Sequence, residues 1–310
     1  MFHTLIKCMI EIAIMVGFGY LMRKRFVSDN TVKELSSILI NITLPCSILA
    51  SSAREFSSEI GNGIILCLLW SLFYYAFFLL AAFIFFRAIG TDERRRGIAT
   101  TSSVFSNSSF IGFPIAETLY GSTGLQYAVA NNMFYTPFMF SFGIRLFSPT
   151  RLSGKDFIKK MLSPSMVTSI LGIVLYFAQV RFPAVIHSSL SSIGSMTVPL
   201  SMMIIGAGLV GADIKAIFSD SLAYLVCFIR LIVVPLILGL IMYLFRMPIL
   251  VIDVCVLIAA IPVGSFNVIL PRQYGGNVEF ANKTVLLSMV FSLVTIPFVL
   301  TIINTLFTGA

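Results

Sequence analysis

The amino-acid sequence predicts an all-α polytopic membrane protein with ten transmembrane helices, arranged as two inverted five-helix repeats. Of its 310 residues, 58% are hydrophobic and only 11% are charged, which is typical of an integral membrane protein. Apolar runs of roughly the 20 residues that a helix needs to cross the hydrocarbon core recur along the whole chain. The phrase Thr-x-Pro-x-Ser also occurs twice, starting at Thr43 and at Thr197, which indicates an internal duplication.

The expected spans lie between charged or turn-rich breaks. Because the chain lacks alternating apolar and polar segments of about ten residues, a β-barrel is not expected and the spans are interpreted as helices. Their expected ranges, in chain order, are 5–22, 32–52, 62–86, 97–119, 124–146, 164–180, 184–210, 220–245, 249–271 and 280–306.

The lysine and arginine residues predict how the spans are oriented. Sixteen of the 21 fall in the connections after spans 1, 3, 5, 7 and 9, whereas four fall on the opposite side. Because positive residues favour the cytoplasmic side, both termini are expected on the non-cytoplasmic side of the cell (cytoplasmic) membrane. The net charge of +8 then requires no nucleic-acid partner, because short basic loops beside lipid headgroups account for it.

One offset relates the two halves of the chain. The shift that aligns the two Thr-x-Pro-x-Ser phrases also aligns Tyr120 with Tyr274, each followed by glycine, so spans 2 and 4 correspond to spans 7 and 9. Each half contains an odd number of spans, so the second half enters the membrane with the opposite orientation. Residues 1–149 and 150–310 are therefore expected to form inverted repeats, the common plan of secondary transporters.

Spans 4 and 9 each contain a stretch too rich in Pro, Gly, Ser and Asn to remain a continuous helix, residues 106–114 and 261–267. In a membrane such breaks persist where the freed backbone faces protein or a water-filled cavity. The half-helix beyond each break would begin near mid-membrane with unpaired amides, which suit a carboxylate. The alternative is a proline kink whose serines bond their own helix. The candidate substrate-binding residues are Asn107, Ser108, Ser109, Pro114, Pro262, Ser265 and Asn267.

Other polar residues inside the spans are candidates for ion coupling or for lining the path. Glu117 lies in the first turn after Pro114, where it either binds a coupling cation or proton or stabilises the helix start. Arg230 lies close to the membrane centre and either pairs with carbonyls or a carboxylate, or serves as a counter-charge for the anion. The remaining candidates, which either line the cavity or satisfy neighbouring backbone, are Asn41, Thr43, Thr197, Ser201, Asn131 and Asn132.

Several remaining residues point away from enzymatic or metal chemistry. Glu11 and Asp253 are expected close to the outer face, solvated from that side, and are left out of the site. The five cysteines lie inside apolar spans without metal-ligand spacing, and the chain has only two histidines. We therefore expect no metal site, no cofactor and no enzymatic activity, while Na⁺ or H⁺ coupling stays open.

In their order and spacing, several phrases resemble the auxin efflux carrier family, whose bacterial members include malate and malonate permease-like proteins. The resemblance implies a fold similar to that of bile acid sodium symporters, with helices 4 and 9 crossing at Pro114 and Pro262. It also implies a scaffold of helices 1, 2, 6 and 7 that forms a homodimer, and a transport domain of helices 3, 4, 5, 8, 9 and 10. Unlike the plant carriers, the chain has only a short connection between its halves, Arg145–Met161. The matching phrases are Asn41-Ile-Thr-Leu-Pro45, Asn107 to Pro114, Thr197-Val-Pro199-Leu and Ile261-Pro262, with Tyr-Gly after the second and the fourth.

Residues and resemblance together predict a secondary transporter for a small organic anion, a mono- or dicarboxylate that is auxin-like or malate/malonate-like. The resemblance implies elevator-type alternating access, with the anion bound where helices 4 and 9 cross. An anion channel or uniporter, and a membrane sensor with the same fold, stay open as alternatives because each would use the same polar groups.

Overall fold

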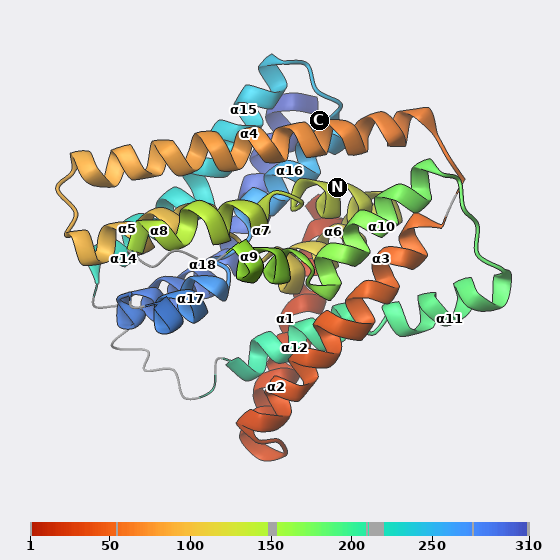
Figure 1. The fold of residues 1–310 in the computed structure, drawn as a ribbon, viewed down its shortest axis with the longest axis horizontal. Coiled ribbons are helices and arrows are strands. Elements are labelled where there is room, and N and C mark those ends of the chain that lie inside the picture. Colours follow the sequence, from red (N-terminus) through yellow and green to blue (C-terminus); the bar gives the residue numbers. More distant parts are fainter. Residues whose placement is uncertain are drawn as a thin grey trace. The chain divides into compact units, whose positions relative to one another are not determined.

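The computed structural model describes residues 2–53, 55–147, 154–208, 210, 220–274 and 276–308, which are helical almost throughout (Figure 1). These residues form no β-strand, and their one β-type contact is an isolated antiparallel bridge. The predicted class, an all-α polytopic membrane protein, is confirmed. Five described stretches are long and apolar enough to cross a membrane, namely Asp29–Ser52, Ser58–Ala88, Ala184–Gly208, Ser221–Leu244 and Val278–Ile303.

Helical residues occupy each of the ten predicted ranges. The first half contains α1 (Phe2–Arg25), α2 (Asp29–Ile38), α3 (Leu44–Ser52), α4 (Ser58–Ala88), α5 (Glu93–Val104), α6 (Phe113–Asn131), α7 (Tyr135–Phe138) and α8 (Ile144–Phe147). The second half contains α9 (Gly154–Met161), α10 (Pro164–Phe177), α11 (Ala184–Gly194), α12 (Thr197–Gly208), α14 (Ser221–Phe228), α15 (Val234–Leu244), α16 (Ile249–Ala260), α17 (Phe266–Tyr274) and α18 (Val278–Thr308). Four π-helical turns lie between helices, η1 (Leu39–Thr43), η2 (Ser108–Gly112), η3 (Met139–Gly143) and η4 (Ile229–Val233).

The chain divides into two compact units. Unit 1 consists of Met1–Cys67, Ser109–Met133 and Leu162–Ala212. Unit 2 consists of Leu68–Ser108, Phe134–Met161 and Asp213–Ala310. The chain therefore passes between the units within predicted spans 3, 4 and 5.

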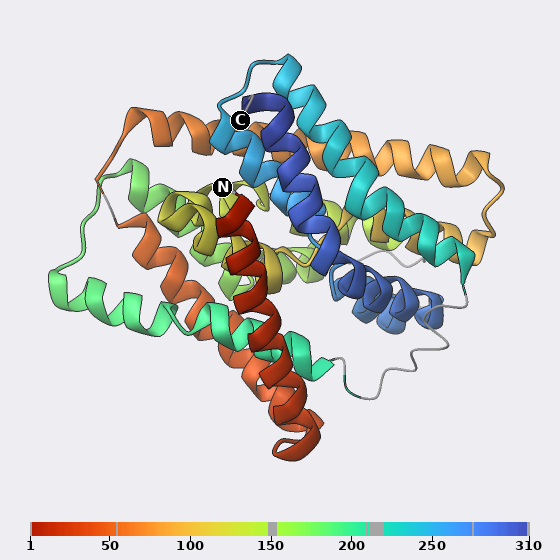
Figure 2. The same cartoon turned by 180° about the vertical axis from the view of Figure 1, so that it is seen from behind.

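Glycines bring two helices of unit 1 into backbone contact. Helix α1 packs along α12, and Figure 2 shows the two crossing. A Cβ atom added at Gly206 would lie 1.9 Å from the carbonyl oxygen of Val16, and one added at Gly19 would lie 2.0 Å from that of Met203. Only glycine fits at either position, which is the close packing that small residues allow between membrane helices.

Three of the π-helical turns share a position relative to a proline. Pro45, Pro114 and Pro235 each follow the last residue of η1, η2 and η4 by two positions. Proline cannot donate to the carbonyl four residues earlier, and its ring crowds that carbonyl. A wider turn relieves the crowding, and the next amide reaches back five residues, as Leu44 N does to the carbonyl of Leu39.

The two Thr-x-Pro-x-Ser copies differ in local structure, although both lie in unit 1. In the first copy Thr43 ends a π-helical turn and the chain continues directly into α3. In the second copy the helix is interrupted earlier, by a turn at Ser195 and Met196, and α12 begins at Thr197. The first copy thus bends without a break, whereas the second restarts a helix whose third residue is Pro199.

Predicted spans 4 and 5 are joined and divided differently from the expected ranges. Helix α6 runs across their boundary, with a bend at Gly121, whose φ of 64° is one that glycine adopts readily. Span 5 is not one helix, because α6 ends at Asn131 and α7 begins after a turn, with Pro137 in its first turns. The connection Arg145–Met161, which reads as a loop, contains helix α9.

Helix α16 forms the centre of unit 2. Every residue from Val251 to Ala260 is buried, and the helix packs against α15, α18 and η4. The prediction that Asp253 is solvated from the outer face is wrong, because the residue is 5% exposed. The packing of neighbouring helices, which the position of a residue within a span does not reveal, covers this carboxyl. Glu11 in unit 1 is by contrast exposed beside Lys7.

Candidate functional site: a backbone crossover in unit 2

Two interrupted stretches, from predicted spans 4 and 9, cross in unit 2. The family resemblance implied a crossing at Pro114 and Pro262, whereas the structure has it at Ser106 and Val263, and Pro114 belongs to unit 1. Helix α5 ends at Val104 and α16 ends at Ala260, and the residue that follows each helix, Phe105 or Ile261, is extended. Ser106 and Val263 then pair as an antiparallel bridge. We call the two extended segments, 105–107 and 261–265, the crossover.

Backbone hydrogen bonds hold the crossover together. Asn107 N donates to the carbonyl of Pro262 at 2.9 Å, and Gly264 N donates to the carbonyl of Phe105 at 3.0 Å. A Cβ atom added at Gly264 would lie 2.6 Å from the carbonyl oxygen of Ser106, so the close approach requires glycine here. The glycine and the proline that signalled a break in the sequence therefore also shape the crossing.

The buried side chain of Arg230, in η4, binds the ends of both interrupted helices. Its Nε donates to the carbonyl of Ile261 at 3.0 Å, one Nη to that of Val104 at 2.9 Å, and the other Nη to that of Ile258 at 3.2 Å. The helical partner of the Ile258 carbonyl would be Pro262, which has no N–H, so the guanidinium replaces the missing donor. Arg230 is 0% exposed.

Tyr74 of α4 completes this arrangement. Its hydroxyl donates to the carbonyl of Val104 at 2.9 Å and accepts a hydrogen bond of 2.6 Å from Arg230. Among the residues that the structure describes, no carboxylate forms an ion pair with Arg230. The guanidinium is thus hydrogen-bonded by neutral oxygens alone, and its positive charge is not neutralised by a side chain.

Asn267, in the first turn of α17, forms hydrogen bonds with both segments of the crossover. Its Nδ2 donates to the carbonyls of Phe105 and Gly264, both at 3.2 Å. The reverse orientation of the amide would place Oδ1 against two carbonyl oxygens, so the hydrogen-bond pattern fixes the assignment. Oδ1 is buried without a partner. Asn267 therefore positions the crossover through Nδ2, and its Oδ1 is still able to accept a hydrogen bond.

Hydroxyl groups cover the buried side of the crossover. Ser106 Oγ and Ser108 Oγ are 2.7 Å apart, and Ser288 Oγ of α18 accepts from Val263 N at 3.0 Å. Sequence reasoning missed Tyr74 and Ser288 as site residues. Ser288 is one of several hydroxyl residues in apolar span 10, and Tyr74 is one of several aromatic residues in span 3, so no sequence signal distinguished either of them.

The predicted substrate-binding residues are divided between the units and differ in exposure. In unit 2, Ser265 is exposed and Asn107 is half-buried, so both are accessible for binding. Helix α17 begins at Phe266, directly after Ser265, so its amino end lies at the accessible side, while the amides of Asn267 and Val268 donate to the carbonyls of Gly264 and Ser265. Ser108, Pro262 and Asn267 are buried in unit 2, whereas Ser109 and Pro114 belong to unit 1.

Unit 1 brings Glu117 together with the first Thr-x-Pro-x-Ser copy. Ser47 Oγ lies 3.1 and 3.0 Å from the two carboxylate oxygens of Glu117 and donates to them. In the second copy Ser201 Oγ donates to the carbonyl of Val198 in its own helix at 2.8 Å. The corresponding serines of the repeat thus have different partners, and only the first binds a carboxylate.

The other predicted path residues of unit 1 mainly contact their own helices. Asn41 Nδ2 donates to the carbonyl of Ser37 at 2.9 Å, and Thr43 Oγ1 to that of Leu39 at 3.3 Å. Thr197 Oγ1 is buried without a partner. Asn131 is buried at the end of α6, and Asn132 is half-buried in the turn that follows.

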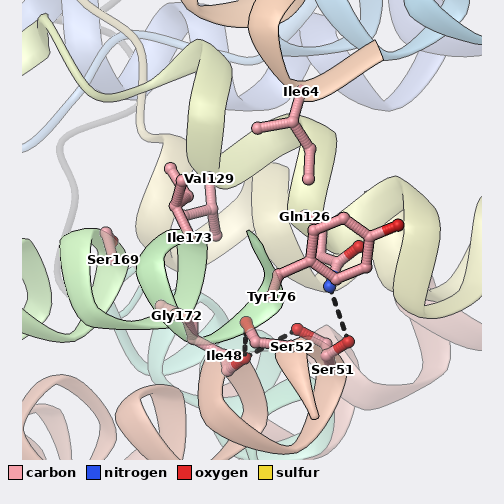
Figure 3. Close-up of a pocket in the computed structure, with 10 residues that line it drawn as sticks. All are labelled: Ile48, Ser51, Ser52, Ile64, Gln126, Val129, Ser169, Gly172, Ile173 and Tyr176. Carbon is pink, nitrogen blue, oxygen red and sulfur yellow. Dashed lines mark hydrogen bonds between the residues drawn. The ribbon is translucent and has the colours of Figure 1, made fainter. Parts of the chain in front are cut away.

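Unit 1 also contains a small, mostly apolar pocket between α3, α6 and α10 (Figure 3). Gln126 Nε2 donates to the carbonyl of Ser51 at 2.7 Å, while Gln126 Oε1 is buried without a partner. The hydroxyls of Ser51 and Ser52 both donate to the carbonyl of Ile48. None of the predicted site residues lines this pocket, so it is separate from the crossover.

Comparison with known proteins assigns the family. The model of the membrane transport protein family matches residues 4–153 and again residues 148–300, so the same pattern occurs twice in the chain. The chain is 24% identical over 297 residues to an uncharacterized transporter of Methanothermobacter thermautotrophicus, which covers 94% of this chain and 96% of the relative. It is 27% identical over 303 residues to an uncharacterized transporter of Methanocaldococcus jannaschii, covering 92% and 94% respectively. The resemblance noted in the sequence is confirmed, and the chain belongs to the auxin efflux carrier-like membrane transport protein family.

Proposed function

We propose that this protein is a secondary transporter that moves a small organic anion, a mono- or dicarboxylate, across the cell membrane. The observation that carries the proposal is the crossover of unit 2, two extended segments held by Asn107, Gly264 and the buried Arg230. Non-helical backbone at membrane depth is tolerated only where protein covers it or where it lines a water-filled cavity. Membership of a transport family supports the second use.

The charges around the crossover support an anion as the substrate. Each helix end carries roughly half an elementary charge, negative at the carboxyl end and positive at the amino end. The carboxyl ends of α5 and α16 together offset the guanidinium of Arg230. The amino end of α17 remains as the net positive element of the crossover, beside the exposed hydroxyl of Ser265. A carboxylate accepts hydrogen bonds from such a hydroxyl and is attracted to the positive amino end of a helix.

Within the proposal, the polar residues have two different roles. Asn107 and Ser265 are accessible and neutral, so they bind the anion by hydrogen bonds that form and break at low cost. Asn267 and Arg230 instead hold the backbone in place, because their N–H groups already bind carbonyls. Loss of either group therefore impairs transport by deforming the crossover.

Alternating access follows from the same arrangement. The division into two compact units supports an elevator-type movement, in which unit 2 carries the crossover as one body. The distribution of lysine and arginine supports termini on the non-cytoplasmic side, and the family resemblance supports a homodimer. In this proposal the protein acts as a transporter and not as an enzyme, and Na⁺ or H⁺ supplies the driving force.

A thermal-shift screen of purified protein identifies the substrate and tests the transporter proposal. Malate, malonate and indole-3-acetate are added with and without Na⁺ at two pH values, and a bound acid raises the unfolding temperature. Acids that bind are then tested in liposomes for saturable uptake and counterflow. Flux without saturation or counterflow would indicate a channel, whereas binding without flux would indicate a sensor. Binding of none of the acids would contradict the anion proposal.

A further inference from the structure

Asp253 is the buried carboxyl of unit 2 that the crossover does not use. It lies in the first half of α16, is 5% exposed, and its Oδ1 has no hydrogen-bond partner. A carboxyl in this state differs from Glu117 in unit 1, whose oxygens both accept from Ser47. The question is what charge such a group carries.

Helix α18, which packs against α16, offers Asp253 no ionisable partner over most of its length. Figures 1 and 2 show these helices running in opposite directions, and the hydrogen bond from Val263 N to Ser288 Oγ ties them at the crossover. The ionisable residues of α18 are Glu279 and Lys283 in its first turns, and from Thr284 to Thr308 the helix contains none.

The ionisable groups on the helices packed against α16 do not neutralise a charge on Asp253. Arg230 in η4 binds carbonyls at the opposite end of α16. Glu279 and Lys283, in the first turns of α18, form an ion pair of 2.7 Å with each other. Tyr243 of α15 is 45% exposed. Arg246, in the connection between α15 and α16, is exposed and forms no ion pair with a described residue. Among the described residues, no ion pair includes Asp253.

The energetics favour a neutral carboxyl. A buried ionised carboxylate without a partner costs several kcal/mol, and in practice such a group becomes neutral instead. A protonated carboxyl leaves one uncharged oxygen unpaired, at a cost of about 1–3 kcal/mol. The lone, buried Oδ1 therefore favours a bound proton over a full negative charge.

We propose that Asp253 is a proton-binding site, which holds one proton in the conformation described here and exchanges it with water in another. The carboxylate takes one proton from water on one side of the membrane and returns it to water on the other side, and no other bond changes. The coupling of this proton to an anion rests on the proposed transport function, but the binding of the proton does not.

Infrared spectroscopy tests the proton site independently of transport. At mildly acidic pH the wild-type protein is expected to show the carbonyl band of a protonated carboxyl, which fades as the pH is raised, and Asp253→Asn is expected to lack this band. Asp29→Asn is the matched control, because Asp29 is an exposed partner of Arg23 and its replacement should leave the band unchanged. A wild-type spectrum without the band, or a band that persists in Asp253→Asn, would overturn the proposal.

Transport under a pH gradient tests the coupling. Liposomes containing wild-type protein are given labelled malonate and a gradient of about one pH unit, with the membrane potential clamped at zero by K⁺ and valinomycin, because one proton with a malonate dianion carries net charge. The gradient then drives up to about tenfold accumulation or depletion if one proton moves with each anion. Asp253→Asn should lose this response and retain malonate counterflow. Equal responses in both proteins would overturn the coupling. Wild-type protein that transports none of the acids would instead refute the proposed function, and the infrared result would still decide the proton site.

Discussion

Arg230 and Asp253 are both ionisable residues buried in unit 2, yet their surroundings are opposite. The guanidinium of Arg230 binds three carbonyls and the Tyr74 hydroxyl, and two of those carbonyls follow from the break at Pro262. Asp253 lies in a continuous part of α16 and has an unpaired Oδ1. A helix break thus creates acceptors that fix a permanent charge, whereas an unbroken helix offers a carboxyl nothing to bind. Arg230 therefore holds the crossover in place, whereas Asp253 is able to bind and release a proton.

Replacing Arg230 with methionine is expected to cause the largest loss of stability among the substitutions considered. The carbonyls of Ile258 and Ile261 lose their donor, and each unsatisfied buried carbonyl costs about 1–3 kcal/mol, so the loss of stability is about 2–6 kcal/mol. Thermal unfolding in detergent measures it. Arg181→Met, which removes an exposed ion pair with Glu55, is the control and should cost at most about 1 kcal/mol. Equal shifts in the two variants would refute the structural role of Arg230.

Replacing Asn267 with aspartate tests whether the amide positions the crossover. The substitution keeps the size but places carboxylate oxygens against the carbonyls of Phe105 and Gly264, so repulsion replaces two hydrogen bonds. We expect Asn267→Asp to lower transport and unfolding temperature more than Asn267→Ala, which only removes the bonds. If the aspartate variant is the better transporter, Asn267 serves instead as an acceptor for a cation.

Removing the Tyr74 hydroxyl is a milder change. In Tyr74→Phe the carbonyl of Val104 keeps its hydrogen bond from Arg230, so the expected loss is about 0.5–1.5 kcal/mol. The same unfolding measurement gives the value. A loss as large as that of Arg230→Met would mean that Tyr74, and not the guanidinium, carries the arrangement.

Asp253→Asn is expected to have the smallest effect on stability. The neutral amide resembles a protonated carboxyl in shape and charge, so the free energy of unfolding at mildly acidic pH should stay within about 1 kcal/mol of the wild-type value. A large destabilisation would indicate that the Asp253 carboxylate is charged and paired, which would contradict the proposal that it binds a proton.

Local chemistry explains which parts were predictable from the sequence. The breaks at 106–114 and 261–267 were predicted because proline and glycine disrupt a helix wherever they occur. The hydrophobic spans were predicted because a run of about 20 apolar residues identifies a membrane-crossing helix from composition alone. The family resemblance pointed to the same two breaks.

Tertiary contacts explain the rest. The three carbonyls that bind Arg230 come from helices that precede and follow it by many residues, so its position in span 8 could not identify its partners. The burial of Asp253 depends on the packing of α15 and α18 against α16. None of these features leaves a mark in the residues immediately around the position.

Counterflow of labelled malonate in liposomes tests whether the crossover binds the transported anion. We expect saturable counterflow in the wild type and about tenfold or greater loss in Asn107→Ala, because a hydrogen bond to a charged group contributes about 1.5–3 kcal/mol. The control Asn30→Ala, which removes an exposed amide bonded to Glu34, should leave the rate unchanged. Wild-type counterflow in a folded Asn107→Ala variant and in Asn267→Ala would contradict the account.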